Sequence, residues 1–135
     1  MATDLIAGLD MSANALAAHK LQMRLIAENI ANAQTTQGPD GKPYQRKVPV
    51  FESLLNEEGV SSVHVKEIKT DKTAGNIIYN PNHPHADKNG YVQMPNVKMS
   101  QEMVDMMMAS RCYEANLKAF KISSNMAQKT LQLGK

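Results

Sequence analysis

The sequence predicts a mainly α-helical protein in which two long terminal helices pair as an antiparallel coiled coil, with a small β or irregular insert between them. Residues 5–33 and 97–133 carry apolar side chains at alternating spacings of three and four, which indicates amphipathic helices. The segment between them shows strand-like alternation, turn signals and prolines. We therefore expect an N-terminal helical segment over 1–36, an insert over 37–95 and a C-terminal helical segment over 96–135, with both ends forming one assembly domain.

The N-terminal helix is expected over residues 5–33, and Thr3 or Asp4 is a candidate cap for its start. Ser12 and His19 interrupt its apolar row. We interpret His19 as a partly buried, hydrogen-bonded packing residue rather than a pH sensor, because a sensor needs an interface with two stable states. The apolar positions of the row are Leu5, Leu9, Leu16, Met23, Ile26, Ile30 and Ala33.

Amide and hydroxyl side chains gather at the end of this helix, at Asn29, Asn32, Thr35 and Thr36. Such side chains compete with backbone hydrogen bonds. One interpretation is a frayed last turn that these side chains cap. The other is a set of polar contacts that fixes the register between subunits, as a buried Asn does in coiled coils.

The C-terminal helix is expected over residues 97–133, with Asn96 as its N-cap. Its apolar residues form two rows, and an arc wider than one seam suits burial between several helices. Cys112 lies in the second row, so we expect a small core residue rather than a reactive thiol. The first row is Met99, Met103, Met106, Ser110, Tyr113, Leu117, Phe120, Ser124, Ala127 and Leu131; the second is Val104, Met108, Cys112, Ala115, Ala119, Ile122, Met126 and Leu133.

The insert is expected to be a set of short strands with little core of its own. Pro49 marks a strand edge or a bulge. Residues 80–87 read as a loop rich in turns, and Lys88-Asn89-Gly90 as a hairpin turn. The expected strands cover residues 43–55, 60–70, 76–79 and 91–94.

Composition and motifs limit the function classes. The net charge is only +2 and no basic block occurs, which argues against nucleic-acid binding. The apolar runs are too short for membrane insertion. The N-terminus lacks the pattern of a signal peptide, so we expect any export to proceed without a cleaved signal. A single cysteine excludes an internal disulfide.

His83, His85 and Asp87 are the only candidates for metal chemistry in the insert loop. They carry donor types that bind zinc, but three donors in a proline-rich loop form a weak motif. We interpret Asp87 and His85 as turn formers whose side chains bond to their own backbone. The chain has neither a nucleophile elbow nor a phosphate-binding loop. We therefore predict no metal site, no cofactor and no catalytic residue.

Several motifs indicate a family. Residues 11–19 (MSANALAAH) and 29–36 (NIANAQTT) resemble the N-terminal signature of bacterial flagellar rod and hook axial proteins. The remainder is similar to the proximal-rod members of that family. The matching segments are residues 79–87 (YNPNHPHAD), 90–92 (GYV), 95–97 (PNV), 102–106 (EMVDM), 109–116 (ASRCYEAN) and 129–134 (KTLQLG).

The resemblance implies a non-enzymatic structural subunit of the flagellar basal-body rod, located in the periplasmic space. Such a subunit leaves the cell through the flagellar type III export apparatus, polymerises helically through its terminal helices and transmits torque from motor to hook. Its expected partners are other rod proteins, the adaptor at the rod base and further copies of itself. The expected assembly interface comprises Leu16, Met23, Asn29, Ile30, Asn32, Thr35, Thr36, Met103, Met106, Tyr113, Asn116, Leu117, Phe120 and Leu131.

Two other hypotheses remain open at this point. The sequence is also consistent with a soluble helical adaptor or chaperone that binds one partner helix in a groove. A metal-dependent enzyme that uses the loop from His83 to Asp87 is a more distant third.

Overall fold

The computed structural model of the chain describes residues 2–55, 57 and 59–134. It confirms two terminal helices that flank a small insert of antiparallel strands. The coiled-coil packing of the predicted fold class stays a prediction. In chain order the elements are α1 (Ala2–Ala31), β1 (Lys47–Leu55), β2 (Ser61–Thr70), β3 (Ile77–Tyr79), β4 (Tyr91–Gln93) and α2 (Met99–Leu133).

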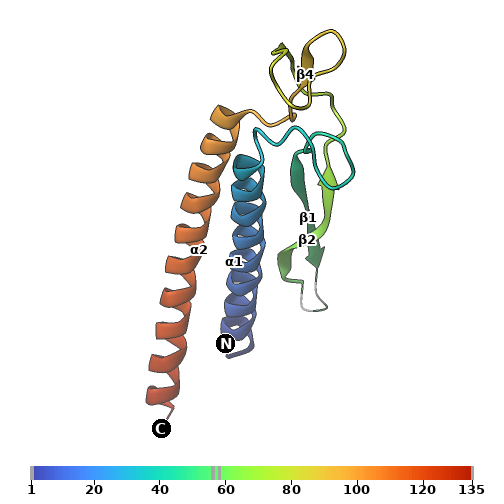
Figure 1. Ribbon diagram of the computed structural model, residues 1–135. Helices are drawn as coiled ribbons and strands as arrows, with labels where there is room; N and C mark the ends of the chain where they lie inside the picture. The colour runs from blue at the N-terminus through green and yellow to red at the C-terminus, as the bar shows by residue number, and fades with distance from the viewer. Residues whose placement is uncertain (1, 56, 58, 135) are drawn as a thin grey trace.

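Helix α1 is the centre of the molecule. It lies between α2 and the hairpin of β1 and β2, and it contacts all three elements (Figure 1). The two helices run in opposite directions, and the C-terminal end of α2 extends past the first turn of α1. Because α1 is covered on two sides, it supplies half of the buried positions among the described residues. These are Ser12, Ala18, Leu25, Ile26 and Asn29.

The first sheet is a two-stranded hairpin that packs against α1. Strands β1 and β2 pair from Lys47 opposite Thr70 to Leu55 opposite Ser61. The register shifts between Val50 and Phe51, beside Pro49, so the predicted bulge is confirmed. Proline is tolerated at this place because a two-stranded sheet leaves an outer edge on each strand.

The second sheet forms the end of the molecule beyond the helices (Figure 1). Strands β3 and β4 pair with Tyr79 opposite Tyr91, and the two rings meet edge to face at a centroid distance of 5.3 Å. Gly90 has a φ of 82°, a conformation that favours glycine, which confirms the predicted hairpin turn. Val92 is 1% exposed and provides a small core in this part of the insert.

Both predicted helix starts differ from the structure. Helix α1 begins at Ala2, so Thr3 and Asp4 lie in its first turn rather than before it, where the carboxylate of Asp4 suits the helix dipole. Helix α2 begins at Met99, and Lys98 occupies the N-cap position without a side-chain hydrogen bond. The prediction that Asn96 caps α2 was wrong, because its amide is engaged elsewhere.

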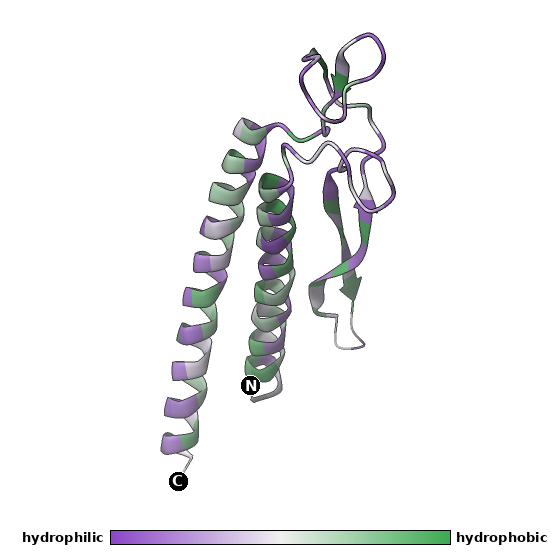
Figure 2. Cartoon of the chain, viewed as in Figure 1, coloured by the Kyte–Doolittle hydropathy of each residue, from purple (hydrophilic) through white to green (hydrophobic). Residues whose placement is uncertain are grey.

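The prediction that Cys112 is a core residue was also wrong, since its side chain is exposed. Among the helices and strands, only α1 packs against α2, and the second apolar row of α2 faces solvent. Figure 2 shows hydrophilic residues along much of the side of α2 that points away from α1. Neither α1 nor α2 contains a stretch long and apolar enough to cross a bilayer in the described residues.

Candidate assembly interface

The site has two parts. One is a polar junction that fastens the insert to the two helices inside the chain, and the other is an apolar surface on α2. The junction consists of Asn29, Tyr44, Arg46, Asn96 and Glu102. These residues come from α1, the segment before β1, the segment before α2, and α2 itself.

Asn29 is the hub of the junction and is 1% exposed. Its Nδ2 donates to the backbone oxygen of Lys47 at 2.9 Å and to Oε2 of Glu102 at 3.1 Å. Its Oδ1 accepts from the backbone N–H of Lys47 and from the hydroxyl of Tyr44, both at 2.9 Å. All four hydrogen-bonding positions of the amide are therefore used, and the side chain pairs with the start of β1 as a neighbouring strand would.

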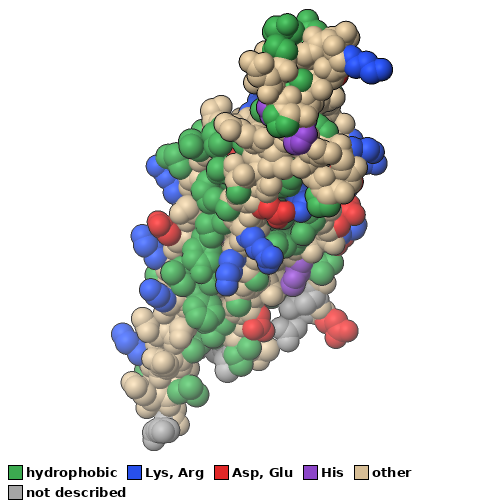
Figure 3. All heavy atoms as spheres, in the orientation of Figure 1, with side chains coloured by type: hydrophobic (Ala, Val, Ile, Leu, Met, Phe, Trp, Pro, Cys, Tyr) green, Lys and Arg blue, Asp and Glu red, His purple; other side chains and the backbone are tan. Residues whose placement is uncertain are grey.

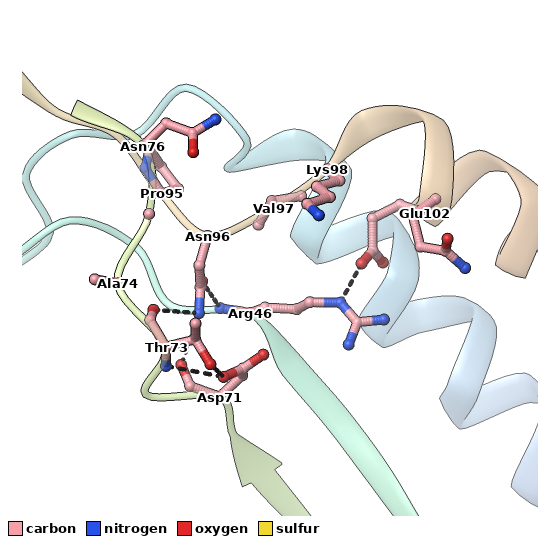
Figure 4. A pocket seen from close by; sticks show the side chains of 12 residues that line it. Arg46, Asp71, Thr73, Ala74, Asn76, Pro95, Asn96, Val97, Lys98 and Glu102 are labelled. Carbon is pink, nitrogen blue, oxygen red and sulfur yellow. Dashed lines mark hydrogen bonds and ion pairs between the residues drawn. The ribbon is translucent and has the colours of Figure 1, made fainter. Parts of the chain in front are cut away.

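Glu102 is the most deeply buried charged residue of the described chain, with 0% exposure. Its Oε1 forms an ion pair with Nε of Arg46 (Figure 4). Nη2 of Arg46 also reaches Oδ2 of Asp105 at 3.3 Å. A buried carboxylate is stable only with such partners, because an unpaired buried charge costs several kcal/mol. The ion pair thus ties the start of α2 to the segment that enters β1.

Asn96 holds the other side of the junction. Its Oδ1 accepts from the backbone N–H of Arg46 at 2.7 Å, and its Nδ2 donates to the backbone oxygens of Asp71 and Thr73, each at 2.9 Å. The hydroxyl and the backbone N–H of Thr73 both donate to Oδ1 of Asp71. These two bonds lower the pKa of Asp71, and the bond from the hydroxyl has the larger effect. An open cleft of about 430 Å³ lies beside these groups (Figure 4), and Lys98 and Gln101 are among the residues that line it.

Tyr44 belongs to the junction through the hydrogen bond from its hydroxyl to Asn29. Burial, followed by the nearby charges of Glu28 and Glu102, raises the pKa of Tyr44 from 10.0 to about 12. The phenol therefore stays protonated at neutral pH and donates its hydrogen bond to Asn29.

The polar side chains at the end of α1 bond mainly within the chain. Nδ2 of Asn32 donates to the backbone oxygen of Glu28 at 2.9 Å, and Oγ1 of Thr35 donates to Oδ1 of Asn32 at 3.1 Å. Thr36 hydrogen-bonds to Nδ1 of His85 at 2.7 Å. This arrangement matches the capping interpretation of Asn32, and it places Asn29 inside the junction, where a neighbouring molecule has no direct access.

The remaining expected interface residues fall into two groups. Most are half-buried within the chain, so they contribute to its internal packing; these are Leu16, Met23, Ile30, Met106, Tyr113, Asn116, Leu117 and Phe120. Met103 and Leu131 are exposed, at 54% and 72%. His19 is half-buried and hydrogen-bonds to Gln22 at 3.1 Å, as predicted.

The second apolar row of α2 is exposed along its whole length. We call it the apolar row, and its members are Val104, Met108, Cys112, Ala115, Ala119, Ile122, Met126 and Leu133. The exposed fraction is 61% at Met108, 60% at Ile122 and 88% at Leu133. Figure 3 shows a band of hydrophobic side chains that runs lengthwise along the helices on the visible face. An extended apolar surface of this kind is typical of a protein interface.

The loop from His83 to Asp87 has a structural explanation. Oδ1 of Asp87 accepts from the N–H groups of Asn89 and Tyr91, both at 2.9 Å, so Asp87 is a turn former as predicted. Nδ1 of His83 accepts from the N–H of His85 at 3.0 Å. The prediction that the His85 side chain bonds to its own backbone was wrong, because its ring bonds to Thr36. Across the described residues, no group of three or more His, Cys, Asp or Glu side chains is arranged to hold a metal ion.

Sequence reasoning missed the junction residues Tyr44, Arg46 and Glu102. Glu102 lies in the first turn of α2, where an acidic residue is expected on dipole grounds alone. Its burial depends on Arg46, which is 56 positions away in the sequence. Local patterns carry no signal for such a pair.

Comparison with known proteins gives consistent similarities over nearly the whole chain. Residues 88–133 match the family described as flagellar basal body rod FlgEFG protein C-terminal. The flagellar basal-body rod protein FlgC of Aquifex aeolicus is 41% identical over 133 residues, which cover 98% of each chain. The FlgC proteins of Salmonella typhimurium and Bacillus subtilis are 40% and 36% identical, over 93% and 94% of this chain and 94% and 96% of their own.

Proposed function

The chain belongs to the FlgC family of flagellar basal-body rod proteins, and on that premise we propose that it polymerises helically through its terminal helices and transmits torque from the motor to the hook. Family membership supports the role of a structural component of the rod. The observation that carries the proposed mechanism is the apolar row, because the described chain leaves it exposed from Val104 to Leu133. A subunit of an assembly buries such a surface against its neighbours.

The junction supports torque transmission in a second way. A subunit that carries torque has to move as one body, and the ion pair of Arg46 with Glu102 and the four bonds of Asn29 connect both helices to the insert. We propose that α1 and α2 form one assembly domain that builds the tube wall, with the insert on its outside.

We further propose three groups of partners, namely other rod proteins, the adaptor at the rod base, and the type III apparatus during export. The proposed location is the part of the basal body that crosses the periplasmic space. These proposals rest on family membership.

Electron microscopy of basal bodies tests the proposed function. A strain that lacks the chain should have absent or truncated rods, and the wild-type gene should restore both rods and swimming. Purified basal bodies from the restored strain should contain the chain on immunoblots. Intact rods in the deletion strain would refute the structural role and support the adaptor or chaperone hypothesis instead.

A further inference from the structure

The apolar row occupies a side of α2 that the chain itself does not cover. At 3.6 residues per turn, its members project from one side of the helix, whereas Glu102, Ala109 and Phe120 project from the side that faces α1. The row is about as long as the helix, from Val104 near the junction to Leu133 at the last turn. Its shape therefore suits another long helix.

Helix α1 offers a matching exposed surface. We call it the outer face of α1; its members recur at spacings of three and four and are Ile6, Asp10, Ala13, Ala17, Lys20, Arg24, Ala27 and Ala31. All of them are exposed, although α1 is otherwise covered by α2 and by the hairpin. The alanines allow a second helix to approach closely, because the distance between helix axes depends on the side chains at the contact.

The charges of the two helices select a direction for this contact. Residues 2–16 carry two acidic and no basic side chains, and residues 17–31 carry two basic and one acidic. Residues 99–116 carry three acidic and one basic side chain, and residues 117–133 carry three lysines and no acidic residue. Antiparallel packing of α2 on α1 places the lysine-rich half of α2 beside the acidic half of α1. A parallel contact between α2 and α1, or between two α2 helices that run in the same direction, brings like charges together, which is unfavourable.

We propose that the apolar row of one copy docks on the outer face of α1 of a second copy, with the two helices running in opposite directions. This inference rests on the proposed function as a rod subunit and specifies its self-contact. The direction is the same as between α1 and α2 within one chain, so all copies point the same way. Because two different surfaces meet, each copy can bind one neighbour on each side, and the contact propagates as an open array.

Disulfide crosslinking in purified basal bodies tests this contact. Cys112 lies in the apolar row and is the single cysteine of the chain. The hydrogen bond between Asn29 and Glu102 places these two residues opposite each other on antiparallel helices. Counting forward along α2 and back along α1 by the same number of residues then places Cys112 opposite His19 of the same chain. The second copy can be displaced along the helix axis relative to the first. We therefore introduce Ala13→Cys, Ala17→Cys or Ala27→Cys one at a time, so that different heights on the outer face of α1 are tested.

Under mild oxidation, at least one of these variants should give a ladder of dimers, trimers and larger species on non-reducing gels, because each copy carries two different reactive positions. The same variant combined with Cys112→Ala should lose the ladder, and the wild-type chain should stay monomeric on the gel. Swimming of each variant shows that the substitution leaves assembly intact.

Three results would overturn the inference in distinguishable ways. Wild-type dimers through Cys112 would show that two α2 helices pack together. Absence of a ladder from all three swimming variants, with the chain present in basal bodies, would refute this contact and leave the proposed function standing. Absence of the chain from basal bodies would refute both.

A charge reversal gives an independent measurement. Asp10→Lys in the laddering variant should lower the crosslinked fraction a few-fold, which is the scale of an exposed ion pair. Adding Lys118→Glu should restore it. No change with Asp10→Lys, or no restoration in the double variant, would contradict the charge-selected direction.

Discussion

Helices α1 and α2 have similar lengths, 30 and 35 residues, and similar apolar spacing, but they differ in what covers them. The hairpin and α2 enclose α1, so Leu25 and Ile26 are each only 4% exposed. Among the helices and strands, α2 packs only against α1, and many of its large apolar side chains remain exposed. Helix α1 thus supplies more of the buried side chains of the subunit, whereas the exposed surface of α2 is rich in large apolar side chains.

The largest expected difference in stability comes from making the same substitution, leucine to alanine, in each of the two helices. Leu25→Ala should lower the free energy of unfolding by about 2–5 kcal/mol, because it removes buried methyl groups and leaves a cavity. Leu131→Ala, at a residue that is 72% exposed, should change it by less than about 0.5 kcal/mol. Urea denaturation of the purified chain, followed by circular dichroism, measures both. Equal effects would show that α1 is no better covered than α2.

The next effect concerns the junction that connects the helices to the insert. Arg46→Ala leaves the carboxylate of Glu102 buried without its cation, so we expect a loss of about 3 kcal/mol. The matched control is Lys66→Ala, which removes an exposed ion pair with Glu52 at 3.3 Å and should cost less than about 1 kcal/mol. Similar losses in the two variants would mean that water reaches Glu102 and that the junction is not a rigid connection.

The comparison also shows what the sequence can and cannot predict. The order of helices and strands follows from local periodicity, and the bulge beside Pro49 and the turn at Gly90 follow from the local chemistry of these residues. The junction does not, because Asn29 and Glu102 meet across 73 positions of sequence. Periodicity identifies an apolar face at Cys112, but only the arrangement of elements decides whether that face is covered.

A smaller effect should appear at alkaline pH. The folded-state pKa of Tyr44 is raised to about 12, so its protonated form contributes stability that is fully present below pH 10.0 and is lost as the pH rises toward 12. Tyr44→Phe removes the hydrogen bond to Asn29 and should cost about 1 kcal/mol at neutral pH. Between pH 10 and 12 the wild-type chain should lose stability more steeply than the variant. Parallel curves would show that Tyr44 titrates as it does in the unfolded chain.

A substitution in the apolar row should have the smallest effect on the stability of the isolated chain. Its effect on assembly should nevertheless be large, and this contrast is the sharpest test of the comparison between the two helices. Met108 is 61% exposed, so Met108→Ser removes no buried contact and should shift the free energy of unfolding by less than about 0.5 kcal/mol. The same change removes a large apolar side chain from the centre of the proposed contact with a second copy, where the lost burial of a methionine costs about 1.5–3 kcal/mol in each interface. Swimming speed and the number of rods per cell should therefore fall although the purified variant melts like the wild type. Lys88→Ser, on the exposed loop between β3 and β4, is the control and should affect neither property. If Met108→Ser cells swim normally, α2 is only a partner of α1, and the apolar row has no role in assembly.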